Sequence, residues 1–180
     1  MAQGSVLHRV NLDISDVDRG VYESVSLRVA RHPSEGEVRL VTRVLAYALL
    51  YEAELEFAKG ISDGDEPALW SRDLTGTLLH WIDVGTPGAD RIHAAAKKAQ
   101  RVSIVCHRGR EALEREMRRR RVHRADEIDV LLLAPDFVAE LAAVMDRNTD
   151  WTVVHTDGDL SVTIGEHHFA GAVTRVALPQ

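Results

Sequence analysis

Hydrophobic and β-branched residues alternate with polar residues over two stretches near the start of the chain, residues 5–14 and 21–30. A period of two is typical of strands that bury one face. The connection between these stretches, residues 15–20, is short and polar. This pattern predicts an antiparallel β-hairpin at the N-terminal end of the chain.

A helical period replaces this alternation after Pro33. Apolar residues recur at helical spacing up to about residue 51, so a helix with one buried face is expected there. Ser34 and Glu37 have the spacing of a capping box, in which each side chain accepts a hydrogen bond from the backbone amide of the other. We therefore expect Ser34 to be the N-cap of this helix.

The middle of the chain is predicted to alternate strands with helices. Residues 55–59 and 77–84 have strand character, and the second stretch follows a turn at 73–76 with Asp first and Gly last. A helix is expected at 90–101, followed by a continuous β-branched strand at 102–106. Strand, helix and strand in this order predict a βαβ unit.

The last third of the chain completes the predicted fold. Its expected elements are a charged helix at 111–121, a buried strand at 128–134, a helix at 135–145 and strands at 151–155 and 160–164. The Asp157-Gly158 pair between the last two strands is typical of a tight hairpin turn. No linker or repeat interrupts this order, so we expect one domain over residues 1–180. The pattern predicts a mixed β-sheet flanked by helices, an α/β (α+β) fold with a β-hairpin at each end.

The composition is that of a globular protein. Hydrophobic residues make up 45% of the 180 residues and charged residues 28%. No apolar run approaches the ~20 residues that a membrane-spanning helix requires, and the first ten residues contain no signal-peptide core. We therefore expect a cytoplasmic protein with no membrane partner. No apolar stripe is long enough to indicate an obligate dimer, so a monomer is expected.

The cysteine content argues against disulfide and structural zinc chemistry. Cys106 is the single cysteine, and the chain has no CxxC or HExxH spacing. Cys106 precedes His107, and a thiolate beside a histidine can act as a nucleophile. Adjacent residues of a strand point to opposite faces, however, so we favour a buried core cysteine.

Positive charge is concentrated in one segment although the net charge of the chain is −6. Residues 108–124 hold eight arginines against three glutamates, which gives this segment a charge of +5. Guanidinium groups pair with phosphate oxygens, so the run at Arg118, Arg119, Arg120 and Arg121 is a candidate nucleic-acid surface. The alternative interpretation is a solvated helix face.

A second candidate anion site lies where the second predicted strand meets the first predicted helix. Arg31, His32 and Ser34 stand at this junction, and Arg39 follows one turn into the helix. The free amides and the positive end of the helix dipole favour an anion at such a place. The alternative is that Ser34 and Glu37 already satisfy these amides as caps.

Two carboxylates are candidate metal ligands. If the strands around residues 73–76 pair as a tight hairpin, opposed positions sum to 149 and Glu66 faces Asp83. Directly opposed carboxylates repel, so such a pair favours a bound divalent cation, for which Mg²⁺ is the natural choice. A bulge at Gly76 would move the two groups apart. Residues 65–67 could also begin a short helix and leave Glu66 as a helix-end charge.

Cations of the helix expected at 90–101 complete this hypothetical site. Arg91 and Lys98 lie on one stripe of that helix, with Lys97 beside them. A metal-bound water that attacks phosphorus and a cation that stabilises the developing charge would suit phosphodiester hydrolysis. The alternative is that these residues are surface charges around a strand end.

Three strings give the chain a resemblance to a known family. Residues 30–35 read ARHPSE, residues 63–70 read DGDEPALW and residues 81–85 read WIDVG, with Pro87 and Arg91-Ile92 following. Their order and spacing resemble the YaeQ family over nearly the whole chain, most closely from residue 28 to 105. The resemblance implies a fold similar to PD-(D/E)XK nuclease-like proteins, with a core in the order αβββαβ and acids on two neighbouring strands. The family itself has no established activity.

The resemblance also implies roles for individual residues. It makes Glu66 the first acidic position and Asp83 the second, with Glu35 as a helper for the metal. The lysine expected two residues after the second acid is replaced by Gly85. Family members often have glutamate at the position of Asp83 and an acid at that of Ala68, so this chain departs from the pattern there too.

Two main functional hypotheses follow. The first is a Mg²⁺-dependent nuclease-like phosphodiesterase acting on nucleic acid, with Mn²⁺ as a substitute and Arg91 or Lys98 in place of the missing lysine. The second is a non-catalytic module that binds nucleic acid or a protein on the same fold. A protein that binds small anions at residues 31–35 is a third hypothesis.

Overall fold

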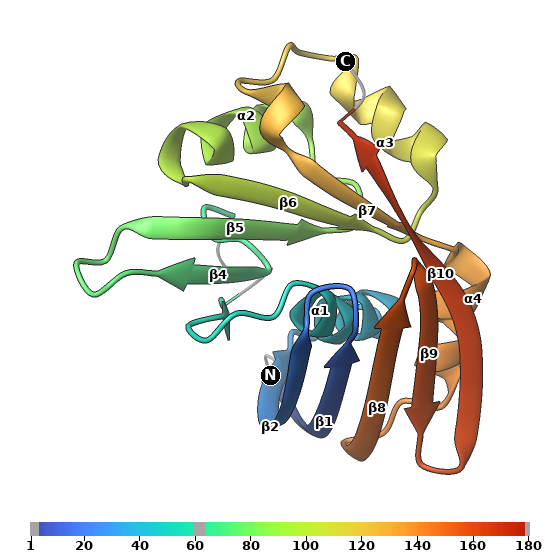
Figure 1. Cartoon of the computed structure of the whole chain (residues 1–180). Helices are drawn as coiled ribbons and strands as arrows, with labels where there is room; N and C mark the ends of the chain where they lie inside the picture. Colours follow the sequence, from blue (N-terminus) through green and yellow to red (C-terminus); the bar gives the residue numbers. More distant parts are fainter. Residues whose placement is uncertain (1–3, 60–63, 179–180) are drawn as a thin grey trace.

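The computed structural model describes residues 4–59 and 64–178, and its strands form one mixed sheet (Figure 1). The strand order is β2-β1-β8-β9-β10-β7-β6-β5-β4-β3. The strands are β1 (Val6–Asp16), β2 (Val21–Arg31), β3 (Glu56–Phe57), β4 (Leu69–Arg72), β5 (Leu78–Val84), β6 (Arg101–Cys106), β7 (Asp129–Leu133), β8 (Asn148–Thr156), β9 (Asp159–Ile164) and β10 (His167–Ala177). The helices are α1 (Glu37–Leu49), α2 (Ala89–Lys98), α3 (Arg110–Met117), α4 (Pro135–Ala143) and the short η2 (Ala125–Glu127).

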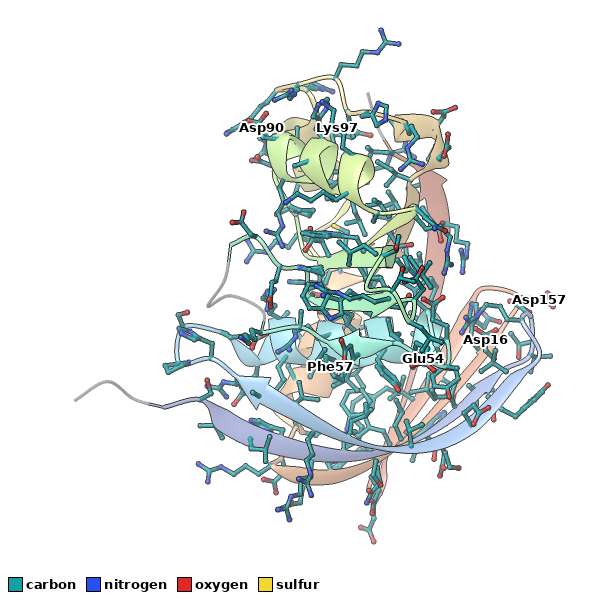
Figure 2. All side chains as sticks on the ribbon, turned by 90° about the vertical axis from the view of Figure 1, so that its left-hand side faces the viewer. Asp16, Glu54, Phe57, Asp90, Lys97 and Asp157 are labelled. Atoms are coloured by element: carbon teal, nitrogen blue, oxygen red, sulfur yellow. The ribbon has the colours of Figure 1, made fainter. Side chains whose placement is uncertain are left out.

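The helices cover the sheet on both faces. The larger hydrophobic core joins α1 and α4 to strands from both ends of the sheet, including Val29 and Ile82. Figures 1 and 2 show α1 enclosed where the sheet curves around it. The smaller core packs α2 and α3 on the other face of β5, β6 and β7. None of the helices in the described parts of the chain has the length and apolar character needed to cross a membrane.

The N-terminal hairpin is confirmed. β1 and β2 pair antiparallel over eleven positions from Val6↔Arg31 to Asp16↔Val21. Burial alternates along β1, as the alternating sequence predicts. β1 also pairs in parallel with β8, from Arg9↔Asn148 to Asp16↔His155. That second pairing joins strands about 140 positions apart, and no local pattern predicts it.

The first helix begins later than the capping box predicts. Its N-cap is Gly36, which makes no side-chain cap. The Ser34 hydroxyl lies 2.7 Å from Nδ1 of His32, and Glu37 accepts from Arg31 at 3.1 Å. The amide of Glu35 donates to the carbonyl of His32, so the chain makes a separate turn there before the helix starts. The capping-box prediction is therefore wrong.

The βαβ prediction is confirmed, but the β4–β5 register is not the one assumed. β5, α2 and β6 form a parallel unit. The Gly76 amide donates to the Asp73 carbonyl at 3.0 Å, which closes the predicted turn, and φ of Gly76 is +85°. The Asp73 amide donates to the Thr77 carbonyl at 3.0 Å, so the strand partner of Asp73 is Thr77 and one residue is added at the turn. A second irregularity lies between Ser71 and Arg72. Each adds one residue on the β5 side, so Leu69 pairs with Ile82 and opposed positions sum to 151.

The C-terminal hairpin is confirmed, and the sheet continues beyond it. Asp157 and Gly158 have φ values of +51° and +83°, as a two-residue turn between twisted strands requires. Strand β10 was not predicted from the sequence. This strand pairs with β9 over residues 167–172 and with β7 over residues 173–177, which joins the two halves of the sheet.

Close packing against α4 accompanies this change of partner. A β-carbon at Gly171 of β10 would lie only 2.7 Å from the ring of Phe137, which is 5% exposed. Only glycine therefore leaves space for the ring against the strand.

We predict that Gly171→Ala lowers the free energy of unfolding by about 1–3 kcal/mol, because the buried Phe137 ring must move. Urea unfolding would measure this loss. Gly4→Ala is the matched control, since a β-carbon there meets nothing within 4 Å and Gly4 lies outside the helices and strands. Equal stability of the parent and Gly171→Ala would show that the ring relocates without cost.

Candidate functional site

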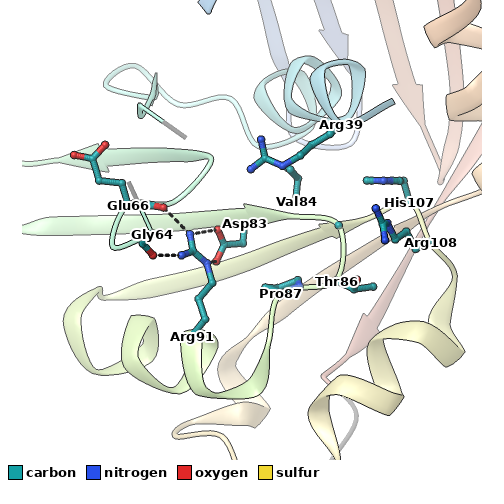
Figure 3. A pocket seen from close by; sticks show the side chains of 11 residues that line it. Arg39, Gly64, Glu66, Asp83, Val84, Thr86, Pro87, Arg91, His107 and Arg108 are labelled. Carbon is teal, nitrogen blue, oxygen red and sulfur yellow. Dashed lines mark hydrogen bonds and ion pairs between the residues drawn. The ribbon is translucent and has the colours of Figure 1, made fainter. Parts of the chain in front are cut away.

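A pocket of about 360 Å³ opens at the carboxyl ends of the parallel strands β5 and β6 (Figure 3). Crevices at this edge of parallel strands are common ligand sites. The pocket is lined by Arg39 of α1, by Gly64 and Glu66, by Asp83, Val84, Gly85, Thr86 and Pro87 after β5, by Arg91 of α2, and by His107 and Arg108 after β6. Four segments distant in sequence thus meet here.

Asp83 is the buried acid of this pocket, with 4% of its surface exposed. Its Oδ2 accepts hydrogen bonds from Nε of Arg91 at 2.8 Å and from Nε1 of Trp81 at 2.9 Å. Its Oδ1 accepts from Nη2 of Arg91 at 2.9 Å. Arg91 also donates to the carbonyls of Gly64 and Glu66. One guanidinium therefore neutralises Asp83 and holds the 64–66 segment against β5.

Glu66 lines the same pocket, but its carboxylate is not beside that of Asp83. Figure 3 shows this carboxylate pointing away from Asp83, while the backbone carbonyl of Glu66 faces Arg91. The Glu66 carboxylate accepts a hydrogen bond from the backbone amide of Lys59 at 3.0 Å. The two added residues shift the register on the β5 side. The hydrogen bond that continues the ladder therefore runs from the amide of Ala68 to the carbonyl of Ile82. The predicted Glu66–Asp83 opposition is therefore wrong.

Glu35 is buried beside the pocket in an ion-pair network. Its carboxylate accepts from Nη1 of Arg39 at 2.7 Å and from Nη1 of Arg43 at 3.1 Å. Arg43 is 2% exposed and also donates to the carbonyl of Ala30. Glu35, Arg39 and Arg43 thus form a network that fixes the end of β2 to α1.

These carboxylates do not fit a Mg²⁺ ion in this arrangement. Within residues 4–59 and 64–178, Glu35, Glu66 and Asp83 do not bring their oxygens together as a group of metal ligands. The oxygens of Asp83 and Glu35 already accept hydrogen bonds from guanidinium groups, which supply the positive charge that a metal would otherwise supply.

His107 forms a polar wall of the pocket. It was not predicted from the sequence as a binding residue. Its Nδ1 lies 3.0 Å from the Thr42 hydroxyl, which donates its proton to the Val38 carbonyl at 2.7 Å. We infer that Nδ1 carries the proton of the neutral ring. Burial, followed by the charges of Arg108 and Arg39, lowers the pKa of His107 to about 4. The ring is therefore neutral near pH 7.

Arg108 is the cation of the pocket that lacks an acidic partner among the described residues. Its side chain is exposed, and α3 begins two residues later. The signal that could have found His107 and Arg108 is their position directly after β6, at the same edge as Asp83.

Of the residues predicted to bind an anion at the strand-to-helix junction, Arg39 lines this pocket, whereas Arg31, His32 and Ser34 are absent from its lining. Arg31 pairs with Glu37, and His32 contacts Ser34, so the strand-to-helix junction satisfies its own polar groups. Lys98 lines a neighbouring pocket with Trp81 and Ala94 instead.

The arginine run after α3 is exposed and only partly paired. Arg118 lies 3.9 Å from Glu114, Arg119 lies 3.7 Å from Glu116 and Arg120 lies 2.6 Å from Asp90. Arg121 has no acidic partner in the part of the chain that the structure describes. The four arginines are thus exposed, which both the predicted nucleic-acid surface and the alternative of a solvated helix face require.

Cys106 is buried in the smaller core, as we favoured from the sequence. Burial raises the pKa of its thiol, which donates to the carbonyl of Gly109 at 3.5 Å. A neutral, enclosed thiol is unsuited to nucleophilic attack.

Glu52, His80 and Ser103 form a further buried polar chain across β5 and β6. Nε2 of His80 lies 2.8 Å from the Ser103 hydroxyl, and Nδ1 lies 3.5 Å from the Glu52 carboxylate. Burial acts to raise the pKa of Glu52, but hydrogen bonds from His80, Ser71 and Arg101 outweigh it and lower the pKa to about 2. Ser103 is only 4% exposed, so we interpret this chain as structural.

We predict that neutral His107 makes the stability of the protein depend on pH. In the unfolded chain the imidazole takes up a proton near pH 6.5, whereas in the folded protein it does so only near pH 4. The contribution is therefore complete above pH 6.5 and is lost as the pH falls towards 4. Between about pH 7.5 and pH 5 the parent should lose about 2 kcal/mol more than His107→Gln, measured by urea unfolding. Parallel losses in both proteins would contradict the assignment.

Known proteins match the chain over most of its length. The model of the family described as "YaeQ protein" matches residues 1–172. The uncharacterized protein YaeQ of Escherichia coli is 28% identical over 159 residues, 88% of each chain. The YaeQ crystal structure from Pseudomonas syringae is 34% identical, with a TM-score of 0.88 over 96% of both chains. That from Xanthomonas axonopodis pv. citri is 31% identical, with a TM-score of 0.89 over 97% of this chain and 99% of that one. The chain belongs to the YaeQ family.

Proposed function

We propose that this protein is a non-catalytic module that binds the phosphate groups of nucleic acid in the pocket between the ends of β5 and β6. The observation that carries the proposal is the charge pattern of the pocket. Arg91 neutralises Asp83, whereas Arg108 has no acidic partner among the described residues. An arginine without a partner, beside a pocket and exposed to water, is suited to bind a phosphate.

The groups around Arg108 favour the binding of an anion rather than of a cation. Arg39 lies on the opposite wall of the pocket, and its second Nη nitrogen is not used by Glu35. The N-terminus of α2 begins just after Pro87, and its N-cap, Gly88, provides no side-chain cap. The positive end of the helix dipole therefore adds to the field of the two arginines.

The arginines of α3 and of the run after it favour a polymer of phosphates, such as nucleic acid, as the ligand rather than a single phosphate. Arg115 and Arg121 have no acidic partner among the described residues, and Arg118 and Arg119 are exposed with ion pairs longer than 3.5 Å. Exposed pairs of this length add little stability and leave the arginines available. Together with Arg108 they belong to the segment 108–124, in which eight arginines outnumber three glutamates, and such an excess of positive charge suits contacts to successive phosphates.

The nuclease hypothesis needs a rearrangement that binding does not need. Asp83 would have to exchange Arg91 for a metal ion, and the Glu66 carboxylate would have to turn towards it. The chain order α1, β3, β4, β5, α2 and β6 agrees with the αβββαβ order that the resemblance implies. Cleavage of nucleic acid is therefore the competing outcome of the experiment described below.

We predict that the protein binds labelled single- or double-stranded DNA or RNA, and that affinity falls steeply between about 50 mM and 200 mM salt. Arg108→Ala should weaken binding about fivefold or more, because a phosphate contact to an arginine is lost. Fluorescence anisotropy would measure both effects. Arg28→Ala, which removes an exposed arginine from β2, is the matched control and should bind as the parent does.

The same preparations would be incubated with each nucleic acid and Mg²⁺ or Mn²⁺ to test for cleavage. Cleavage by the parent that disappears in Asp83→Asn would replace our proposal with the nuclease hypothesis. Absence of binding at low salt, or equal loss in Arg28→Ala and Arg108→Ala, would refute the assignment of the pocket.

A further inference from the structure

We propose that Asp16, Asp18 and His155 form a binding site for a divalent transition-metal ion of the Zn²⁺ class. This cluster lies where the β1–β2 turn meets the end of β8, away from the pocket described above. The ligand atoms of the three residues all lie within 4.8 Å of one another. Asp16 and His155 are paired positions of the parallel strands β1 and β8, so they point to the same face.

His155 is the strongest indication of a missing ligand. Its side chain is buried, with 7% of the residue exposed, yet its Nδ1 makes no hydrogen bond among the described residues. That atom lies 3.2 Å from Oδ1 of Asp16 without hydrogen-bond geometry. Two ligands that are each about 2.0–2.1 Å from a tetrahedral ion lie roughly 3.3 Å apart. The observed spacing fits two ligands of one metal, and it is also the spacing of an ion pair between the two side chains.

The backbone and Arg19 hold the two carboxylates in place. Oδ1 of Asp18 accepts from the amide of Asp157 at 2.9 Å, and its Oδ2 lies 3.8 Å from Nε2 of His155. Oδ2 of Asp16 accepts from Nε of Arg19 at 2.7 Å, and Oδ1, which lies on the side of His155, also accepts from the amide of Arg19 at 3.1 Å. Figure 2 shows Asp16 and Asp157 at the same end of the molecule. Such outer hydrogen bonds orient metal ligands in known sites.

The donor set selects the class of metal. One imidazole nitrogen and two carboxylates suit Zn²⁺ and similar ions, whereas Mg²⁺ and Ca²⁺ prefer oxygen ligands alone. Three protein ligands leave a fourth position for water. The charge of Arg19 offsets part of the charge of Asp16, so the two carboxylates do not carry the full repulsion without the ion. A bound ion would tie the β1–β2 turn to the β8–β9 turn.

The test is calorimetric titration of the full chain with Zn²⁺, together with the visible absorption of added Co²⁺. The parent should bind one equivalent and gain in melting temperature. Asp18→Asn and His155→Gln should each weaken Zn²⁺ binding about 10- to 100-fold and remove the gain. Asp13→Asn, which changes the same charge at an exposed position of β1, should bind as the parent does.

Asp18 has an exposed side chain (35%), so Asp18→Asn should fold even if the buried His155→Gln variant does not. Binding that is unchanged in Asp18→Asn, absent from the parent, or lost only in His168→Gln would overturn the proposal. The last result would place the ion at the exposed pair His167 and His168 instead.

Discussion

Strand β10 bonds to β9 along its first half and to β7 along its second, and this divided pairing makes one sheet from two. The close contact of Gly171 with Phe137 lets α4 pack at the change of partner. Because the sheet is continuous there, α1 is enclosed by strands from both halves. The pocket depends on this enclosure, since Arg39 of α1 lines it and Thr42 of α1 contacts His107 in its wall.

Buried charge in this protein is balanced by arginine wherever a strand end meets a helix. Arg91 neutralises Asp83, Arg39 and Arg43 neutralise Glu35, and Arg19 neutralises Asp16 while donating to the carbonyls at the end of α1. A planar guanidinium can satisfy a carboxylate and backbone carbonyls at once. Each arginine thus fixes an element boundary as well as a charge, and at Asp83 and Glu35 the guanidinium groups occupy the carboxylate oxygens that a metal ion would need.

Local patterns in the sequence predicted the elements whose cause is local. The alternation in β1 and the Asp157-Gly158 turn gave both hairpins correctly. The parallel β1–β8 pairing could not be predicted, because nothing near residue 9 encodes a contact with residue 148. Strand β10 was not predicted, because its exposed positions and Gly171 weaken the alternation of apolar and polar residues that indicates a strand. The candidate site was predicted only in part. Asp83 and Arg91 were predicted as site residues, but the predicted opposition of Glu66 and Asp83 is wrong because two single-residue irregularities shift the β4–β5 register.

The backbone at Gly85 is unsuited to a residue with a side chain. The resemblance implies a lysine at this position, two residues after Asp83. Here φ of Gly85 is +86°, a conformation that strains any residue with a side chain, and a β-carbon would lie 3.6 Å from Cε1 of His107. A lysine at Gly85 would therefore be strained by the backbone, and its side chain would start beside the neutral His107. Arg91, one turn into α2, supplies the charge from a position where the backbone is unstrained.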